Sequence, residues 1–583
     1  MVKRWVVKDK ENSEVIQHLT EELSIDPVLS KLLYLRGISS FEDARLFFRP
    51  TLSMLHDPFR LKDMGVATDR ICSAIENNER ILIYGDYDVD GTTAVALLYS
   101  FLKEFYSNVD FYIPDRYSEG YGISFKSLDY ASENNFSIII SLDCGIKAVK
   151  QVNYAQEKGI DFIICDHHRP GEIIPPAYAV IDPKQNDCPY PYKELSGCGL
   201  SFKIVHALSK KRNIPFSSIE NFLDLVVISI AADIVPITDE NRVLSYFGLK
   251  QINFSPRPGI ESILFYSNVF RKTQPDEKTI FTKEITINDL IFMVGPRINA
   301  AGRVASGNSS VELLICETMA DTHDLSVNID SHNTERRSLD LEITKQALKR
   351  IDEDHTLKTS KATILYDPTW HQGVIGIVAS RLTESYYRPT IILTQSNDLI
   401  TGSARSIKDF DIYDAIHACS EYLENFGGHK YAAGLSLKPE NLTAFSKAFE
   451  NYVKENITNE MLVPEIEIDA NIKLYEISDK FLRILKQFEP FGPGNSNPVF
   501  ITQGLTDRGS AKIVGNNHLK LKVSHPDNPR TEFNAIAFQQ GNFLPGIQQG
   551  KKFDITYHIE ENTWNGYTST QLNISNIRFY KDK

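Results

Sequence analysis

The sequence has little that would place the chain in a membrane or outside the cell. No run of about 18 uncharged apolar residues occurs, and the most apolar stretch, 223–237, is broken by Asp224 and Asp233. Charged residues recur every few positions among the first ten, so we expect no secretory signal. The seven cysteines are odd in number and form no Cys-x-x-Cys pair, which argues against a disulfide framework and a zinc ribbon. We therefore expect a cytoplasmic protein without a membrane segment.

The chain also lacks an excess of basic residues and any low-complexity tract. Its 63 Lys and Arg stand against 76 Asp and Glu, a formal net charge of −13. This balance excludes a protein that coats nucleic acid by bulk charge, but it allows a local basic groove. The 31 Gly and 26 Pro among 583 residues are too few for a disordered or collagen-like chain. At roughly 150 residues per domain, the length predicts two to four globular domains.

Strands and helices alternate along the first half of the chain. Apolar runs at 80–84, 137–142 and 160–165 are typical of short buried strands, and the segment from Thr92 has helical composition. This alternation predicts an open, mostly parallel α/β sheet. Few Gly or Pro occur between 309 and 354, which indicates long connecting helices.

The second half of the chain divides into two further regions. Residues 361–457 alternate again, with strands expected near 363–366 and 390–393 and helices near 374–386 and 412–425, which predicts a smaller α/β domain. Beyond Pro464, short alternating runs with Gly, Pro and Asn turns predict a small β-barrel. We therefore expect an N-terminal segment (1–60), an α/β catalytic domain (61–308), a helical linker (309–360), a second α/β domain (361–460) and a β-barrel (461–583).

Three carboxylates occupy alternate positions directly after the first strand, at Asp86, Asp88 and Asp90. Their spacing matches the start of a calcium-binding EF-hand loop, but Leu97 stands where that loop needs Glu and a strand precedes the motif instead of a helix. Open α/β sheets bind ligands at the carboxyl ends of their strands, and a helix N-terminus follows here. Three like charges so close together require a counter-ion.

Further polar residues follow the next two strands. Asp143 comes after the run 137–142, and the sequence Asp166-His167-His168 comes after 160–165. A single Asp at a strand end is usually a helix cap, but neighbouring strand ends share one rim of a sheet, so we expect these side chains to meet the earlier carboxylates. Asp233, at the close of an otherwise apolar helix, would be costly there without a partner.

Carboxylates with one or two histidines supply mostly hard oxygen ligands, which favour Mn²⁺ or Mg²⁺. Two such ions roughly 3.5–4 Å apart would activate a water molecule and stabilise an in-line phosphoryl displacement. The pattern therefore predicts phosphoester hydrolysis. A zinc site built from Cys144, Cys165, His167 and His168 is the alternative, but these residues lack the usual ligand spacing.

These motifs resemble those of the DHH phosphoesterase superfamily. The resemblance rests first on Gly85–Gly91, Leu142–Gly145, Asp166–His168 and Ala231–Asp233. Later motifs are similar to those of the RecJ family of bacterial single-strand-specific exonucleases, which degrade DNA from the 5′ end: Ile113–Gly122, Gly295–Arg303, Trp370–Arg381, Gly402–Ser406 and Gly427–Gly434. The resemblance extends from about residue 60 to 540. It implies a DHH domain with a parallel sheet, a DHH-associated domain, long helices joining the two α/β lobes, and an OB-type barrel.

The resemblance also implies roles for individual residues. The implied metal ligands are Asp88, Asp90, Asp143, His167 and Asp233, with Asp86 close to the first metal. His168 would face the scissile phosphate, and Asp166 would orient the histidines. Many relatives carry a metal-binding His at the position of Tyr84, so we expect Asp86 or solvent to replace that ligand.

Candidate substrate-binding residues lie in the later motifs. Ser403 and Arg405 suit a bidentate grip on a terminal phosphate, with Arg116 as a further candidate. Arg297, Asn299 and Arg303 are candidates too. The alternative is a structural role, in which these residues connect a loop to the linker helices. The pair Gly427-Gly428 fits a helix C-cap by spacing alone, whereas the resemblance implies that His429 lies over the active-site cleft.

The predicted barrel carries aromatic and basic residues suited to a single strand. Phe533, Phe538, Tyr557, Trp564 and Tyr567 offer stacking faces, with Lys520, Lys522, Lys551 and Lys552 nearby. Most aromatic residues on short strands belong to a core, so only a minority of the five should be exposed. The implied OB-fold commonly binds single strands by base stacking and backbone charge.

The sequence thus predicts a 5′→3′ exonuclease that releases 5′-mononucleotides from single-stranded DNA through two Mn²⁺ or Mg²⁺ ions, in DNA repair and recombination. A single-strand-binding protein and a RecQ-type helicase are the expected protein partners. The alternative is a DHH phosphodiesterase acting on short oligonucleotides or cyclic dinucleotides, but such relatives have only the two lobes. A non-enzymatic replication scaffold is a third hypothesis, disfavoured because the acidic motifs are complete.

Overall fold

The computed structural model describes residues 3–8, 12–120, 122–304, 306–564 and 567–580. The chain forms two compact units, Thr51–Leu462 and a second one in which Met1–Pro50 joins Val463–Lys583. No helix among the described residues combines the length and the apolar character needed to cross a bilayer.

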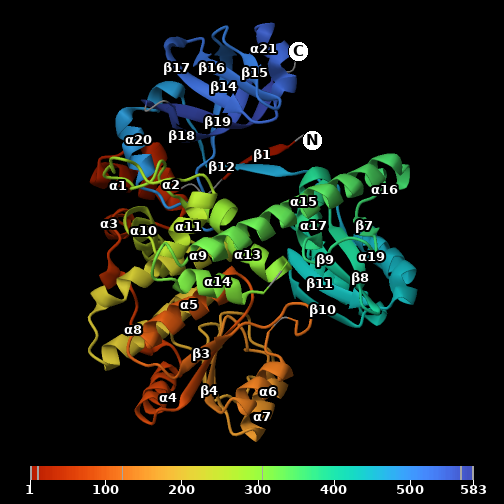
Figure 1. The fold of residues 1–583 in the computed structure, drawn as a ribbon. Helices are drawn as coiled ribbons and strands as arrows, with labels where there is room; N and C mark the ends of the chain where they lie inside the picture. Colours follow the sequence, from red (N-terminus) through yellow and green to blue (C-terminus); the bar gives the residue numbers. More distant parts are fainter. Residues whose placement is uncertain (1–2, 9–11, 121, 305, 565–566, 581–583) are drawn as a thin grey trace. The chain divides into compact units, whose positions relative to one another are not determined.

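The first lobe of the larger unit is built on a five-stranded parallel sheet with the strand order β3-β2-β4-β5-β6. The strands are β2 (Arg80–Gly85), β3 (Val109–Tyr112), β4 (Phe136–Leu142), β5 (Asp161–Cys165) and β6 (Ala179–Ile181). Because side chains alternate along a strand, Ile81 and Ile83 enter one core while Leu82 and Tyr84 enter another. Helices on both sides make these strands apolar throughout, as predicted for a parallel sheet (Figure 1).

Two groups of helices cover the two faces of this sheet. On one face lie α4 (Met64–Glu76), α5 (Val89–Lys103), α8 (Gly197–Lys211) and α9 (Leu223–Ala232). On the other lie α6 (Phe125–Glu133) and α7 (Val149–Glu157). Helix α9 is buried along its length and ends at Asp233, so its C-terminus delivers a carboxylate to the edge of the core.

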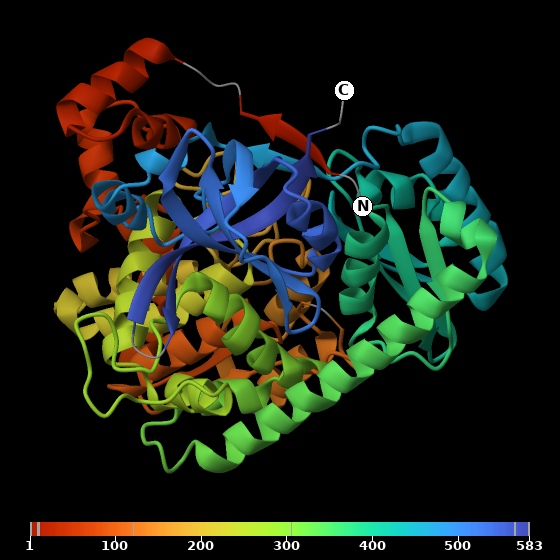
Figure 2. The same cartoon turned by 90° about the horizontal axis from the view of Figure 1, so that it is seen from above.

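A long helix links the two lobes of this unit. After α10 (Asp239–Phe254), α11 (Pro258–Tyr266), α13 (Gly295–Val304) and α14 (Asn308–Ile315), helix α15 spans 31 residues, His323–Glu353. It contacts α11, α13 and α14 of the first lobe and α17 (Ile375–Tyr386) of the second, and Figure 2 shows it crossing between them. This is the long connecting helix that the sequence predicted.

The second lobe has a mixed five-stranded sheet with the order β10-β11-β9-β8-β7. Its strands are β7 (Thr363–Tyr366), β8 (Thr390–Ser396), β9 (Leu399–Arg405), β10 (Asn425–His429) and β11 (Ala432–Leu437), and α18 (Ile412–His417) and α19 (Leu442–Asn456) pack against it. Gly427 and Gly428 lie in β10, so the helix C-cap alternative was wrong. Gly428 has φ +148°, and a Cβ there would lie 2.4 Å from the Ala432 carbonyl oxygen of the paired strand.

The smaller unit contains the predicted barrel. Strands β14 (Phe500–Asp507), β18 (Phe553–Trp564), β19 (Tyr567–Phe579), β17 (Asn528–Ala537) and β16 (His518–His525) pair in that order, and β14 also pairs with β16, which closes the ring. The edge strand β15 (Lys512–Val514) pairs with β16. Because β14 and β16 pair with each other, neither strand has an unpaired edge where the ring closes.

The N-terminal residues belong to the barrel unit, which the sequence did not indicate. Strand β1 (Arg4–Val7) pairs in parallel with β12 (Glu465–Ile468). Helices α1 (Ser13–Leu23), α2 (Pro27–Leu35) and α3 (Phe41–Phe48) share one apolar core with α20 (Asp479–Lys486) and the barrel. Arg36 lies 5.1 Å from the ring centroid of Phe488 and donates to Asn495 Oδ1 at 2.6 Å.

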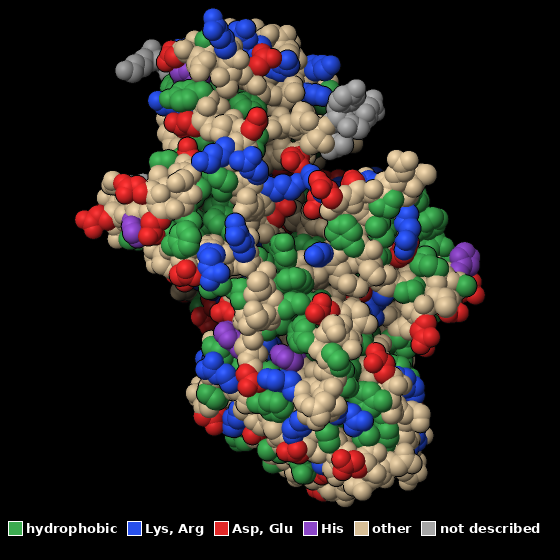
Figure 3. Space-filling view, turned by 90° about the vertical axis from the view of Figure 1, so that its left-hand side faces the viewer, with side chains coloured by type: hydrophobic (Ala, Val, Ile, Leu, Met, Phe, Trp, Pro, Cys, Tyr) green, Lys and Arg blue, Asp and Glu red, His purple; other side chains and the backbone are tan. Residues whose placement is uncertain are grey.

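The aromatic residues of the barrel differ in their exposure to solvent. Tyr557 is fully buried, Phe533 is half-buried, and Phe538 is 52 % exposed beside His518. The side chains of Trp564 and Tyr567 lie outside the described residues. Lys520, Lys551 and Lys552 are exposed, whereas Lys522 pairs with Glu532 at 2.8 Å. Figure 3 shows many Lys and Arg side chains on the barrel unit, at the top of that view.

Candidate metal centre and phosphate pocket

Three strands of the parallel sheet end side by side at the candidate site. In the pairing register, Gly85 of β2 lies opposite Leu142 of β4, and Leu142 lies opposite Cys165 of β5. The next residue of each strand is therefore an aspartate on the same rim: Asp86, Asp143 and Asp166. This is the position at which open parallel sheets bind ligands.

The loop from β2 to α5 folds tightly around its carboxylates. Asp88 is the N-cap of α5 and accepts a hydrogen bond from the Gly91 N–H at 3.0 Å, while Asp90 lies in the first turn. A Cβ at position 91 would lie 2.4 Å from the Asp86 carbonyl oxygen, so only glycine allows the helix to start so close to the strand end. The loop therefore directs three carboxylates to the rim within five residues.

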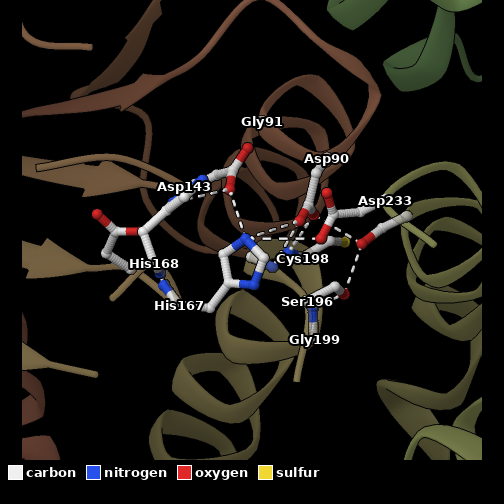
Figure 4. A network of polar contacts seen from close by, with 12 residues as sticks. Asp90, Gly91, Asp143, His167, His168, Ser196, Cys198, Gly199 and Asp233 are labelled. Carbon is white, nitrogen blue, oxygen red and sulfur yellow. Dashed lines mark hydrogen bonds and ion pairs between the residues drawn. The ribbon is translucent and has the colours of Figure 1, made fainter. Parts of the chain in front are cut away.

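His167 lies at the centre of the cluster (Figure 4). Its Nε2 is 3.1 Å from Asp143 Oδ1, 3.6 Å from Asp90 Oδ2 and 3.7 Å from Asp233 Oδ2. Two sets of three groups, Asp143 with both histidines and Asp90 with His167 and Asp233, each place one ligand atom per residue within 4.8 Å of the others. The predicted metal ligands from four separate segments therefore meet in space.

Several polar atoms of this cluster are buried without a protein hydrogen-bond partner. They are both carboxylate oxygens of Asp86, Oδ1 of Asp143 and both ring nitrogens of His167. Burial raises the pKa of Asp86 and of Asp143, and the neighbouring carboxylates raise each further. A divalent cation would satisfy the carboxylate oxygens and Nε2 of His167 and balance the charge, so the donor set fits Mn²⁺ or Mg²⁺.

Tyr84 does not replace the missing histidine of the first motif. Its hydroxyl donates to the Gly122 carbonyl oxygen at 2.7 Å, and its ring stacks on Tyr112 with centroids 5.8 Å apart. The side chain belongs to the core on the opposite face of the sheet. Both carboxylate oxygens of Asp86 are buried without a protein hydrogen-bond partner, so the replacement of that ligand by Asp86 or by solvent stays a prediction.

Asp166 holds the two histidines in place. Its Oδ1 accepts from His168 Nδ1 at 2.8 Å and from the His167 N–H at 2.7 Å, and its Oδ2 accepts from the Ile146 N–H at 2.9 Å. Burial alone would raise the pKa of Asp166, but its hydrogen bond to His168 and that residue's charge outweigh burial and lower it to about 2. For His168, burial lowers the pKa, but the hydrogen bond to Asp166 and the charge of Asp166 raise it, so that the net pKa is about 9. These contacts fit the orienting role predicted for Asp166.

A group of arginines forms a second polar region beside the metal cluster. Burial, followed by the positive charges of Arg116, Arg336 and Arg405, lowers the pKa of Arg303 to about 10. Among the described residues, no carboxylate forms an ion pair with Arg116, Arg303 or Arg405. Like charges held together in this way favour a bound anion. Arg336, on the linker helix α15, was not among the predicted binding residues.

Ser403 and Arg405 lie at the N-terminus of α17. Arg405 donates to Ser403 Oγ at 3.0 Å, and a Cβ added to Gly376 would lie 2.9 Å from that Oγ and 3.1 Å from Arg405 Nη2. The first N–H groups of a helix are a favourable position for an anion. The helix N-terminus, the hydroxyl and the guanidinium thus lie together, and the binding of a phosphate there stays a prediction.

The other predicted substrate-binding residues have different surroundings. Arg297 is engaged by Asp330 Oδ1 at 3.0 Å and by the carbonyl oxygens of Met293 and Tyr266, which favours the structural alternative. Asn299 lies half-buried on the same helix, α13. His429 is on β10, and its pKa is lowered by burial and then by the charges of His168, Lys147, Lys184 and Arg169. The hairpin that carries His429 therefore faces the loops around the metal cluster.

Comparisons with known proteins agree with this architecture. Residues 80–230 match the DHH family N-terminal domain, 359–455 the DHHA1 domain and 468–576 the RecJ OB domain. The single-stranded-DNA-specific exonuclease RecJ of Bacillus subtilis is 34% identical over 574 residues, covering 98% of this chain and 70% of that protein. The protein of the same name from Escherichia coli is 31% identical over 575 residues, covering 95% and 96%.

A solved structure has the same fold. RecJ of Thermus thermophilus, crystallised with Mn²⁺, superposes with a TM-score of 0.83 at 24% identity, covering 99% of this chain and 80% of that one. The same protein has also been solved with Mg²⁺.

Proposed function

The chain belongs to the RecJ family, and we propose that it is a metal-dependent exonuclease specific for single-stranded DNA. The observation that carries this proposal is the strand-end cluster, in which buried oxygens of Asp86 and Asp143 and both nitrogens of His167 have no protein hydrogen-bond partner. The arginine pocket, formed by Arg116, Arg303, Arg336 and Arg405 together with Ser403, lies beside it. The first region suits divalent cations, and the second suits a phosphate of the substrate.

Asp90, His167 and Asp233 would hold one metal ion, and Asp86 and Asp88 the other, with Asp143 shared between them. When bound, such a pair lowers the pKa of a water molecule and stabilises the charge on the phosphoryl oxygens. Asp166 holds Nδ1 of His168, which directs the opposite edge of the ring away from Asp166. We assign that edge to the scissile phosphate.

The arginine pocket gives the proposed enzyme its polarity. Ser403, Arg405 and the N-terminus of α17 would bind a terminal 5′-phosphate, and Arg116, Arg303 and Arg336 would supply further positive charge. Arg provides a planar, bidentate grip that suits a phosphate. Binding the first phosphate in the pocket would place the next phosphodiester at the metal cluster, so each cut would release one 5′-mononucleotide.

The barrel unit would bind the rest of the strand. Phe538 offers an exposed ring, and Lys520, Lys551 and Lys552 offer exposed charges for the backbone. An enzyme that consumes single strands also depends on proteins that produce or cover them. A helicase of the RecQ type and a single-strand-binding protein are therefore the partners we propose, in DNA repair and recombination.

A cytoplasmic location is part of the same proposal. All seven cysteines are free, and five of them are buried, which suits a reducing compartment.

Removing the barrel unit should separate strand binding from chemistry. The two units have separate apolar cores, so a protein spanning 51–462 keeps every proposed metal ligand and the arginine pocket. We expect it to cleave a very short oligonucleotide about as fast as the full chain but to bind long strands weakly, because each lost base stack removes about 1–3 kcal/mol. Turnover on oligonucleotides of increasing length measures this contrast.

Both ends of the chain must be removed together in this experiment. A protein ending near Val463 would keep 1–50 without the barrel that covers their apolar side. Circular dichroism establishes that the 51–462 protein is folded. Equal activity and processivity on a long strand would show that the barrel does not bind DNA, and would favour an enzyme that acts on short substrates.

A further inference from the structure

The carboxylate of Asp90 is held by an unusual number of donors. Its Oδ2 accepts from the Gly197 N–H at 2.7 Å, and its Oδ1 accepts from the Cys198 N–H at 2.7 Å and from Ser229 Oγ at 2.6 Å. The two N–H groups belong to the first turn of α8, a 15-residue helix, and Asp90 is 2 % exposed. The carboxylate therefore accepts three hydrogen bonds, two of them from the N-terminus of α8.

The hydroxyls of Ser229 and Ser196 form a chain that leads to this carboxylate. Ser229 Oγ is 2.6 Å from Ser196 Oγ, and Ser196 Oγ accepts from the Gly199 N–H at 3.1 Å. A hydroxyl carries a single proton, and a carboxylate that binds a metal ion only accepts hydrogen bonds. Ser229 therefore donates to Asp90, and its Oγ stays within hydrogen-bond distance of Ser196 Oγ.

This chain decides which oxygen of Asp90 faces the proposed metal. Oδ1 has two donors, whereas Oδ2 has one and lies 3.6 Å from His167 Nε2. Oδ2 is thus the atom directed toward the set of Asp90, His167 and Asp233, and Ser229 opposes rotation of the carboxylate away from it. Figure 4 shows Asp90 close to His167, to Asp233 and to Cys198, which belongs to the first turn of α8.

Ser229 also connects two elements that each supply a ligand. Asp90 is on α5, whereas Ser229 is on α9, one turn before Asp233. The Asp233 N–H donates to the Ser229 carbonyl oxygen at 2.9 Å, so the serine and the second ligand move as one turn of helix. The hydroxyl therefore fixes the separation between the carboxylates of Asp90 and Asp233.

We propose that Ser229, supported by Ser196, is a positioning residue that sets the affinity of the metal ion held by Asp90, His167 and Asp233. This inference rests on the metal site proposed above and adds a determinant outside the ligand set. Groups that hydrogen-bond to metal ligands typically change metal affinity by about 10- to 100-fold when they are removed. A serine that only filled the core would leave metal affinity unchanged.

Metal-free protein titrated with Mn²⁺ by calorimetry tests this proposal without any turnover. We expect Ser229→Ala to weaken one of the Mn²⁺ sites by about tenfold or more, and Ser196→Ala to weaken the same site less because Asp90 keeps its bond to Ser229. Since Ser196 acts through Ser229, the double variant should match Ser229→Ala alone. Ser209→Ala is the matched control, because Ser209 is likewise buried in a helix, α8, but its hydroxyl donates to the backbone carbonyl oxygen of His206.

Each outcome of the titration has a clear meaning. Equal Mn²⁺ affinities in wild type, Ser229→Ala and Ser209→Ala would overturn the role of Ser229. If the effects of Ser229→Ala and Ser196→Ala added up in the double variant, the claim that Ser196 acts through Ser229 would be overturned. Should Ser229→Ala fail to fold, Ser196→Ala alone carries the test, and an unchanged affinity overturns the proposal. Wild-type protein that binds no Mn²⁺ would instead contradict the metal site itself.

Discussion

Replacing Asp143 by Ala is expected to abolish strand cleavage while leaving single-strand binding nearly intact. Asp143 lies 3.1 Å from His167, follows the central strand β4, and is the ligand we assign to both metal ions. Losing it should impair both ions at once, and a loss of several powers of ten, at least about a thousandfold, is expected. Turnover of a labelled strand and its binding in excess chelator measure the two effects separately.

Stability distinguishes this role from a structural one. Burial and the neighbouring carboxylates raise the pKa of Asp143, so its charge costs stability when no metal is bound. Metal-free Asp143→Ala should therefore melt no lower than metal-free wild type. Asp129→Ala, at an exposed carboxylate that pairs with Tyr154, serves as the control for activity. Wild-type turnover in Asp143→Ala, or in wild type with excess chelator, would contradict the metal mechanism.

Arg405→Ala should remove the enzyme's preference for a 5′-phosphate. Arg405 is beside Ser403 and the N-terminus of α17, where a terminal phosphate would make charge-assisted hydrogen bonds worth about 1.5–3 kcal/mol, or roughly 10- to 150-fold. Wild type should therefore degrade a 5′-phosphorylated strand faster than a 5′-hydroxyl strand by about that factor. The two strands should be degraded at similar rates by Arg405→Ala. Initial rates on the two strands give the ratio for each protein.

Arg297→Ala is the matched control for this experiment. Its guanidinium is occupied by Asp330 and two carbonyl oxygens, so this variant should keep the 5′-phosphate preference and lose stability instead. A phosphate dependence that is the same in wild type and Arg405→Ala would place the pocket elsewhere. Loss of the preference in Arg297→Ala alone would restore Arg297 as a binding residue.

The metal cluster could be predicted from the sequence because parallel strands place their carboxyl ends together. Asp86, Asp143 and Asp166 each follow an apolar run, and the register of β2, β4 and β5 aligns those ends. Knowing the strands was therefore enough to bring these residues together. Asp233 was harder to place, but a carboxylate at the end of a buried helix already suggested a partner.

Other features depend on contacts that no local pattern reveals. Ser196 and Ser229 read as ordinary helix residues, and only their 2.6 Å separation shows the chain to Asp90. Arg336 lies on the helix that the sequence predicted only as a connection between the lobes, yet its side chain is half-buried near Arg303. The pairing of β1 with β12 joins residues 461 positions apart, so the boundary drawn at residue 60 could not foresee it.

Digestion of an end-labelled single strand with Mn²⁺ tests the central claim most directly. The account predicts that a 5′ label is released at once as a mononucleotide, whereas a 3′ label stays on a strand that shortens progressively. Excess chelator should stop both reactions, and a blunt duplex of the same sequence should resist. Early release of the 3′ label, equal digestion of the duplex, or cleavage that persists in chelator would contradict a metal-dependent, single-strand-specific exonuclease acting from the 5′ end.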